Sequence, residues 1–325
     1  MTPLPIRTVF FGTPEFAVPS LQVLLETCSV VAVVTQPDRP RGRGRVLAAP
    51  PVARAARERG LPVLQPARLK SPEVVEQLRS LHPDLIVTAA YGKIIPKEIL
   101  DLPPLGAINV HPSLLPKHRG ASPISAAILH GETTTGVTIL FQSMELDAGD
   151  IILQRVVPIA PEDTARTLEA KLAAVGAEAL AEALRLIAEG RAPRIPQDHA
   201  LASYAGKLEK VHGRIDWTRP AHELVSLVRA MDPWPSAYTW HRGRLLKVWR
   251  AQAEPGKGAP GTVVEIRRGD GFTVGTGAGL LLILEVQPES GRRMSAGEFA
   301  RGARLRVGEV LAMSPPGRPG SAELL

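Results

Sequence analysis

Short apolar runs rich in β-branched residues alternate with amphipathic stretches in the first part of the chain. The apolar runs cover residues 7–11, 30–35, 62–64, 85–89 and 107–110. Helical periodicity covers residues 15–26, 51–59 and 71–81. Strands that alternate with helices are typical of βαβ units around a parallel sheet. The pattern therefore predicts an α/β domain with a mainly parallel sheet.

The same domain continues through two more strands and a long helix. Residues 137–141 and 151–158 are strands with a short connection, which indicates a mixed edge to the sheet. Residues 162–189 are rich in Ala, Leu and Glu and end at Gly190, as a helix does. Residues 191–197 hold two prolines and break the pattern, so we expect them to form a linker.

The character of the chain changes after residue 206. One helix is expected over residues 221–231, and short β-type runs follow it. These runs cover residues 237–240, 245–249, 261–266, 272–276 and 280–286. Short strands in series without intervening helices favour a small antiparallel barrel. We therefore expect an α/β domain over residues 1–206 and a small β-barrel domain over residues 207–325.

Composition sets the broad class of protein. With 325 residues, 44% of them hydrophobic and 22% charged, the chain has the composition of a soluble globular protein. No apolar stretch reaches the roughly 18 residues that a membrane helix needs, and the N-terminus lacks the long apolar core of a signal peptide. Cys28 is the only cysteine, which excludes an internal disulfide and a cysteine-based metal site. We expect a cytoplasmic protein with no membrane partner.

Positive charge is unevenly distributed along the chain. The net charge is +7 at pH 7, and residues 207–325 hold 18 Lys and Arg against 12 Asp and Glu. In the first domain, residues 36–47 contain four alternating arginines, namely Arg39, Arg41, Arg43 and Arg45. Basic patches of this kind suit a polyanion such as nucleic acid. The alternative is an arginine-rich surface that is only solvated.

The first predicted βα turn, Gly12-Thr13-Pro14-Glu15, differs from the G-x-G-x-x-G turn of nicotinamide enzymes. No acidic residue is placed to hold a ribose, which argues against that class of enzyme. Thr13 suits the N-cap of the following helix, Pro14 its first residue and Glu15 its positive dipole end. We interpret this turn as mainly structural.

Asn109, His111 and Asp147 form the most informative polar set. Asn109 and His111 lie two residues apart at the end of an apolar strand, so their side chains share one face. Pro112 holds His111 in extended backbone, and open α/β sheets bind ligands at the carboxyl ends of their strands. For a lone histidine, or for a turn aspartate such as Asp147, the alternative is a structural hydrogen-bonding role.

Two segments resemble the signature of the 10-formyltetrahydrofolate-dependent formyltransferases. They are N-V-H-P-S-L-L-P-K-H-R-G-A-S-P-I at 109–124 and L-D-A-G-D at 146–150. Further segments resemble the branch of this family that acts on methionyl-tRNA, and together they cover essentially the whole chain in order. These segments are F-G-T-P-E-F (11–16), T-Q-P-D-R-P-R-G-R-G-R (35–45), A-A-Y-G-K-I-I-P (89–96), T-G-V-T-I (135–139), R-I-D-W (214–217), D-P-W-P (232–235) and K-V-W (247–249).

This resemblance implies a Rossmann-like first domain that binds the folate, and a second domain of the oligonucleotide-binding (OB) barrel kind. It implies formyl transfer from 10-formyltetrahydrofolate to the methionine α-amine of initiator methionyl-tRNA. This chemistry requires no metal, the sequence supplies no ligand cluster for one, and we expect a monomer. The residues that match the catalytic set are Asn109, His111 and Asp147. Those that match the folate-contacting loop are Ser113, Leu114, Leu115 and Pro116. Those that match the tRNA-binding loop are Arg41, Arg43 and Arg45, with Arg43 the principal contact.

The three residues of the catalytic set suit acyl transfer to an amine. An α-amine has a pKa of about 8, so part of it is already a neutral nucleophile. Its attack on a formyl carbon creates an oxyanion, to which Asn109 and a protonated His111 can donate hydrogen bonds. We expect Asp147 to raise the pKa of His111 and keep the imidazole charged, or to accept the amine proton through water.

Two other functions remain open at this point. One is a formyltransferase of the same family that acts on a small amine, such as a sugar nucleotide or glycinamide ribonucleotide. The other is a catalytically silent chain that binds tRNA without turnover. A small substrate has no use for a basic loop and a basic barrel, and the intact catalytic set argues against the silent chain. For residues 113–116, the alternative to folate contact is a rigid connector.

Overall fold

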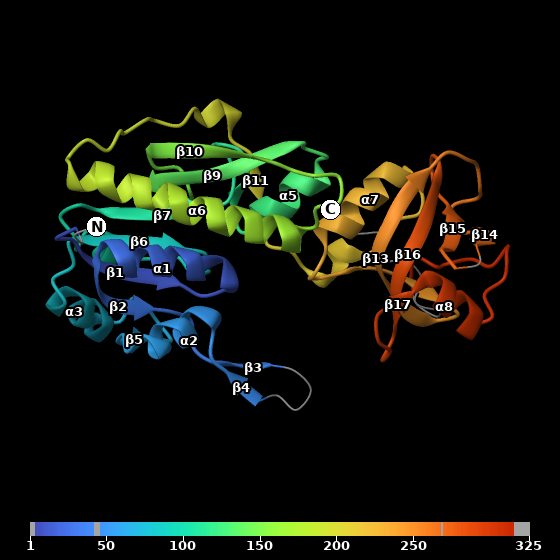
Figure 1. Cartoon of the computed structure of the whole chain (residues 1–325), viewed down its shortest axis with the longest axis horizontal. Coiled ribbons are helices and arrows are strands. Elements are labelled where there is room, and N and C mark those ends of the chain that lie inside the picture. The colour runs from blue at the N-terminus through green and yellow to red at the C-terminus, as the bar shows by residue number, and fades with distance from the viewer. Residues whose placement is uncertain (1–3, 42–45, 268, 315–325) are drawn as a thin grey trace. The chain divides into compact units, whose positions relative to one another are not determined.

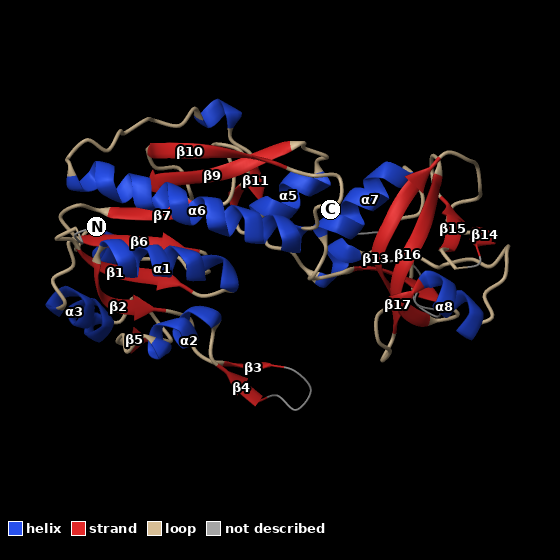
Figure 2. Cartoon of the chain, in the orientation of Figure 1, coloured by secondary structure: helices blue, strands red, loops and turns tan. Residues whose placement is uncertain are grey.

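The chain forms two compact units, and each is described here by itself. The computed structural model describes residues 4–41, 46–267 and 269–314. The first unit comprises residues 1–123, 134–158 and 168–206. The second unit comprises residues 124–133, 159–167 and 207–325. Figure 1 labels their elements along the chain, and Figure 2 separates helices from strands.

A seven-stranded sheet forms the centre of the first unit (Figure 1). Its strands are β1 (Arg7–Gly12), β2 (Ser29–Val34), β5 (Val63–Leu64), β6 (Leu85–Ala89), β7 (Ala107–His111), β9 (Thr134–Phe141) and β10 (Ile151–Pro158). The spatial order is β10-β9-β7-β6-β1-β2-β5. The strands from β7 to β5 are parallel, whereas β9 pairs antiparallel with both β7 and β10. The predicted Rossmann-like, mainly parallel sheet is confirmed.

Alternating side chains on β1 pack against helices on the two faces of this sheet. The helices are η1 (Glu15–Ala17), α1 (Val18–Thr27), α2 (Pro51–Glu58), α3 (Pro72–Ser80), α4 (Lys97–Leu100) and α6 (Ala165–Ala188). Val9 and Phe11 share a buried cluster with Leu78 of α3 and Ile99 of α4. Phe10 points the other way, because neighbouring strand residues face opposite sides. Each such side chain contributes about 1.5–3 kcal/mol when fully buried, which fixes the face on which each helix packs.

Helix α6 lies directly on the strand that carries the candidate catalytic residues. Gly176 makes this possible, because a Cβ atom there would come within 3.0 Å of Val110 in β7 and 3.6 Å of Val137 in β9. Figure 1 shows α6 and α1 crossing in front of the sheet. A glycine in mid-helix lowers helix propensity, so its position here serves the close contact with β7.

The predicted N-cap of the first helix is wrong. The residue before η1 is Pro14, whose side chain makes no cap, and the α-helix itself begins only at Val18. The hydroxyl of Thr13 instead donates to the carbonyl of Tyr91 at 3.0 Å. Thr13 therefore ties the end of β1 to the loop after β6, a long-range contact that local sequence cannot show.

Two small sheets complete the first unit. Strands β3 (Arg39–Arg41) and β4 (Val46–Ala48) pair antiparallel, and β8 (Arg119–Gly120) pairs parallel with β11 (Tyr204–Ala205). Residues 191–197, which are predicted to form a linker, precede η2 (His199–Leu201) and β11. They do not run free of the first unit, because Ile195 pairs with Ile151 of β10 and returns this segment to the sheet.

The second unit contains an antiparallel sheet in the order β12-β13-β16-β15-β14, with β17 beside β16. Its elements are α5 (Pro123–Leu129), η3 (Lys210–Gly213), α7 (Ala221–Ala230), β12 (Ala237–His241), β13 (Arg244–Glu254), β14 (Val263–Arg267), β15 (Gly271–Gly275), β16 (Leu280–Pro288), β17 (Met294–Ser295) and α8 (Ala296–Gly302). The predicted series of antiparallel strands is confirmed.

One backbone segment joins the two edge strands of this antiparallel sheet. Val263 of β14 donates to the Glu309 carbonyl and accepts from the Gly308 N–H, and Leu311 donates to the Gly261 carbonyl. Ala312 bonds reciprocally with Trp240 of β12. The same short segment thus pairs with both edges. This is how a short sheet closes on itself, as expected for a small barrel.

Among residues 4–41, 46–267 and 269–314, no helix combines the length and apolar character needed to span a membrane.

Candidate active site

Asn109, His111 and Asp147 come together at the carboxyl edge of the parallel sheet. Asn109 and His111 project from β7, and Asp147 comes from the turn between β9 and β10. The Asn109 side-chain nitrogen lies 3.4 Å from Asp147 Oδ1, and His111 Nδ1 lies 3.6 Å from Asp147 Oδ2. The structure therefore brings together three residues that 38 positions separate in sequence.

The side chain of Asn109 is oriented by a neighbouring strand. Thr88 of β6, which is paired with Asn109 in the sheet, donates its hydroxyl proton to Asn109 Oδ1 at 2.7 Å. With the oxygen turned toward Thr88, the amide NH₂ group faces Asp147. One of its two N–H bonds points at the carboxylate, and the second has no acceptor among the described residues, so it can donate to a reacting oxygen.

His111 is buried, with only 4% of its surface exposed. Its Nε2 lies 3.0 Å from the carbonyl oxygen of His118, which can only accept, so Nε2 carries a hydrogen. Burial lowers the pKa of His111 below its ordinary value of 6.5, outweighing the Asp147 charge and the His118 carbonyl, which both raise it. Asp147 thus raises the pKa as expected, but burial has the larger effect and the net shift is opposite in direction to the expected one. The sequence showed the carboxylate but not the loss of water around the ring.

The Asp147 carboxylate has a fixed partner besides the other two catalytic candidates. Gly120 of β8 donates its backbone N–H to Asp147 Oδ2 at 2.9 Å. Gly120 itself has φ +111°, and a Cβ atom there would lie 2.8 Å from the carbonyl oxygen of Ala205. Only glycine therefore suits this position, which lets β8 lie between Asp147 and β11.

Gln197 and Arg119 are functional candidates that the sequence did not reveal. Gln197 Nε2 donates to the carbonyls of Asp147 and Gly149, each at 2.8 Å. Arg119 donates to Gln197 Oε1 from Nε and Nη2, at 3.2 and 2.8 Å. Gln197 lies in residues 191–197, the predicted linker, where no periodicity marks a residue as buried. Arg119 lies in the matched motif at 109–124, but the resemblance implies no role for it.

The candidate folate loop, residues 113–116, is tightly fastened to the sheet. The hydroxyl of Thr138 in β9 donates to the carbonyl of Ser113 and accepts from the backbone N–H of Leu115. The Ser113 side chain is fully buried, and that of Leu115 packs with Leu140 and Ile151. Leu114 and Pro116 are partly exposed, so a ligand at this loop would meet these two side chains and the backbone.

The candidate tRNA loop is attached to the carboxyl edge of the sheet through Gln36. The Gln36 side-chain nitrogen donates to the carbonyl of Tyr91 at 2.9 Å, and its oxygen accepts from Arg39 of β3 at 2.6 Å. Gln65 donates to the Gln36 carbonyl at 2.9 Å and to Asp38 at 2.7 Å. The base of the β3–β4 hairpin is thus hydrogen-bonded to the ends of β5 and β6.

Of the three arginines predicted to bind tRNA, Arg41 is the last residue of β3. Arg43 and Arg45 lie outside the described residues. The structure describes β3 and β4, the strands on either side of these two arginines. The role of the arginines in tRNA binding stays a prediction.

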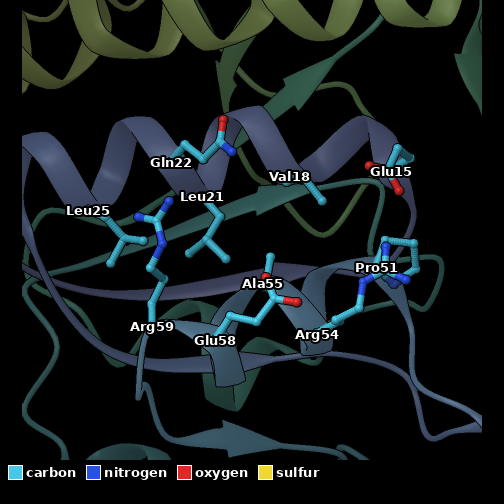
Figure 3. A pocket seen from close by; sticks show the side chains of 10 residues that line it. All are labelled: Glu15, Val18, Leu21, Gln22, Leu25, Pro51, Arg54, Ala55, Glu58 and Arg59. Carbon is cyan, nitrogen blue, oxygen red and sulfur yellow. The ribbon is translucent and has the colours of Figure 1, made fainter.

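Within the described ranges, no group of three or more His, Cys, Asp or Glu side chains is arranged to hold a metal ion. A hollow of about 190 Å³ lies between α1 and α2 (Figure 3). Its walls combine Glu15 and Glu58 with Arg54 and Arg59. It contains none of the candidate catalytic residues and is separate from them.

Comparison with known proteins agrees with this geometry. The formyl transferase family matches residues 6–184, and the C-terminal domain of formyl transferases matches residues 207–304. The methionyl-tRNA formyltransferase of Acetivibrio thermocellus is 47% identical over 310 residues, which are 94% of this chain and 99% of that protein. The chain belongs to the methionyl-tRNA formyltransferase family. The relative from Symbiobacterium thermophilum is 50% identical over 97% of both chains.

Solved structures of more distant proteins share the fold. HypX from Aquifex aeolicus has a TM-score of 0.63 and 23% identity over 94% of this chain, which spans about half (49%) of HypX. An N-formyltransferase from Helicobacter canadensis, solved with folinic acid and dTDP-3-aminofucose, has a TM-score of 0.64 and 18% identity, covering 86% of this chain and 99% of that one. HypX has also been solved with tetrahydrofolic acid. At these identities the likeness establishes the fold that this family member adopts.

Proposed function

We propose that this chain transfers the formyl group of 10-formyltetrahydrofolate to the α-amine of methionine on initiator methionyl-tRNA. The observation that carries this proposal is the match to methionyl-tRNA formyltransferases over 94–97% of the chain. The sequence match extends through the second unit. The converging Asn109, His111 and Asp147 supply the chemistry, which makes a silent tRNA-binding protein the weaker alternative.

Asn109 acts as a hydrogen-bond donor to the oxyanion in this mechanism. When the amine nitrogen attacks the formyl carbon, the carbonyl oxygen gains negative charge and needs a donor already in place. The Asn109 N–H that has no acceptor among the described residues is such a donor. The Asp147 carboxylate can only accept, so it keeps the amide nitrogen, and not the amide oxygen, on its side. Removing one donor of this kind costs on the order of 100- to 1,000-fold in kcat.

His111 acts first as a base in the proposed reaction. Its lowered pKa makes the neutral form dominant at neutral pH, and Nε2–H is committed to the His118 carbonyl. The free lone pair is then on Nδ1, which faces Asp147 at 3.6 Å. As the new C–N bond forms, Nδ1 accepts the proton of the attacking amine, and Asp147 stabilises the resulting imidazolium.

The proton and the leaving group balance in the second half of the reaction. As the bond between the formyl carbon and N10 of the folate breaks, the imidazolium returns its proton to N10. The products are formyl-methionyl-tRNA and tetrahydrofolate, and His111 is neutral again. The protein forms no covalent bond to either substrate in this scheme.

The remaining site assignments are part of the same proposal. The folate meets residues 113–116 through Leu114, Pro116 and the backbone, while Ser113 and Leu115 keep the loop in place. Arg41, Arg43 and Arg45 contact tRNA phosphates near the acceptor end, because an arginine-rich loop offers charge without a hydrophobic anchor. The enzyme acts as a cytoplasmic monomer. Gel filtration with light scattering tests the oligomeric state.

The direct experiment incubates the purified chain with 10-formyltetrahydrofolate and charged initiator tRNA, and measures formyl-methionine by mass. We expect turnover, and a loss of about 1,000-fold in kcat for His111→Ala because the base is removed. tRNA binding by His111→Ala, measured by filter retention, should equal that of the unmodified chain. Gln77→Ala, at an exposed position on α3, is the control.

Two results would contradict the proposal in different ways. Formylation of glycinamide ribonucleotide or an amino sugar nucleotide in preference to the tRNA would assign the chain to small substrates. Tight tRNA binding with no product from any amine would identify a silent binding protein.

A further inference from the structure

The side chain of Arg119 is completely buried beside the candidate active site, which is unusual for a guanidinium group. It makes two hydrogen bonds to Gln197 Oε1, and its Nη1 lies 3.5 Å from a Glu145 oxygen and 3.4 Å from His199 Nδ1. A buried charge is unfavourable unless it is paired and hydrogen-bonded. The Gln197 oxygen therefore has a fixed partner, and this partner determines the orientation of the Gln197 amide group.

With its oxygen held by Arg119, Gln197 must turn both N–H bonds toward the turn that carries Asp147. They meet the carbonyl oxygens of Asp147 and Gly149, each at 2.8 Å. Both polar atoms of the Gln197 side chain, Oε1 and Nε2, thus have hydrogen-bond partners. Reversing the amide would place an NH₂ group against the guanidinium and an oxygen against two carbonyls.

The turn that Gln197 holds has an unfavourable backbone conformation. Asp147 has φ +50°, in the left-handed region that most residues avoid. Gly149 is enclosed so tightly that a Cβ atom would lie 1.9 Å from the carbonyl oxygen of Phe141. Such a conformation persists only where the surrounding structure holds it.

We propose that Gln197, oriented by Arg119, is a positioning residue that holds the Asp147 turn so that its carboxylate faces His111 and Asn109. This inference rests on the proposed formyl transfer. Gln197 touches neither substrate in this scheme and acts through the backbone of Asp147 and Gly149. A shift of the Asp147 carboxylate by about 1 Å is enough to cost on the order of 100-fold in rate.

Gln197→Glu separates positioning from simple structural support. The substituted carboxylate keeps the size of the side chain and both acceptor contacts with the Arg119 guanidinium, so the buried charge stays paired. It loses both N–H donors to the turn and places oxygen against the two carbonyls. We expect kcat to fall about 100-fold, while the KM values for folate and methionyl-tRNA stay close to those of the unmodified chain. The thermal unfolding midpoint should fall as well, because two buried hydrogen bonds are lost, but the variant should remain folded at the assay temperature.

Gln77→Glu is the matched control, because it makes the same substitution at an exposed position on α3. It should leave kcat unchanged. Gln197→Asn is the second variant, in case the first does not fold. It is neutral and keeps the amide, but its shorter arm cannot reach both Arg119 and the turn, so kcat should fall about 10-fold.

The outcomes distinguish this inference from the proposed function. An unmodified chain that makes no formyl-methionine would overturn the proposed function itself. Turnover by the unmodified chain together with unchanged kcat in a folded Gln197→Glu or Gln197→Asn would overturn only the positioning role. A loss confined to the unfolding midpoint or to both KM values would also overturn it, since positioning predicts a loss in kcat.

Discussion

The two units of the molecule differ in the burial of the basic side chains that are expected to act in each. In the first unit, His111 and Arg119 are buried, and each has partners at defined distances. In the second unit, basic side chains such as Arg244, Arg250 and Arg292 are exposed. Acyl transfer depends on the position of a few groups, whereas binding of phosphates depends on charge and tolerates displacement. Substitutions in the two units should therefore change different kinetic parameters.

The largest effect among the following tests is expected for Asp147→Asn. Asparagine tolerates the left-handed backbone and can still accept from the Gly120 N–H. What it loses is the negative charge beside His111, so kcat should fall about 100-fold with both KM values unchanged. Steady-state kinetics measure this. Asp150→Asn, in the same turn and ion-paired with Arg194 at 3.7 Å, is the control, and equal losses in both variants would remove the special role of Asp147.

A smaller and different effect is expected for Arg43→Ala. Loss of a phosphate contact should raise the KM for methionyl-tRNA about 10-fold and leave the KM for folate unchanged. The control is Arg59→Ala, an exposed arginine at the end of α2. Equal increases in both KM values would show that the loop acts on the folate side of the site or on folding, which would contradict its predicted role.

Arg244→Ala and Arg250→Ala test the comparison in the second unit. Both residues are exposed on β13. Each variant should weaken tRNA binding a few-fold and reduce the salt dependence of the binding constant by about one charge. Binding is measured over a range of salt concentrations, with Arg79→Ala on α3 as control. A fall in kcat at saturating tRNA would mean that these arginines do more than bind phosphates.

The smallest effect concerns stability at acid pH. Because the pKa of His111 is lower in the folded chain than its ordinary value of 6.5, the unfolded chain binds the extra proton first as the pH falls. This contribution to stability is therefore present above pH 6.5 and is lost as the pH drops through the lower pKa of the folded chain. His111→Gln should lose less stability than the unmodified chain between about pH 7 and about pH 5. Parallel unfolding curves for the two would contradict a depressed pKa.

The parallel sheet could be predicted because its pattern is local. Each buried strand is a short apolar run between turn residues, and β7 also carries Asn109 and His111 at same-face spacing. Asp147 was placed with them by resemblance, since nothing local shows that the turn between β9 and β10 reaches β7. The fold thus followed from periodicity, and the site from a motif whose parts are distant in sequence.

What the sequence did not show depends on long-range burial. Gln197 lies beside a proline in a stretch without periodicity, so its two bonds to the Asp147 turn gave no signal. Thr13 looked like a helix cap because its true partner, the Tyr91 carbonyl, is 78 positions away. The sequence also predicts the wrong direction for the His111 pKa shift, for the same reason. A motif shows a neighbouring charge, but it does not show that water is excluded from the ring.

The segment over residues 308–312 has a consequence for truncated forms of the chain. Cutting the chain after residue 307 would leave β12 and β14 as two open strand edges with unpaired backbone groups. Open edges recruit strands from other molecules. Such a shortened protein is therefore expected to aggregate in a concentration-dependent manner, although every residue of its catalytic unit would still be present.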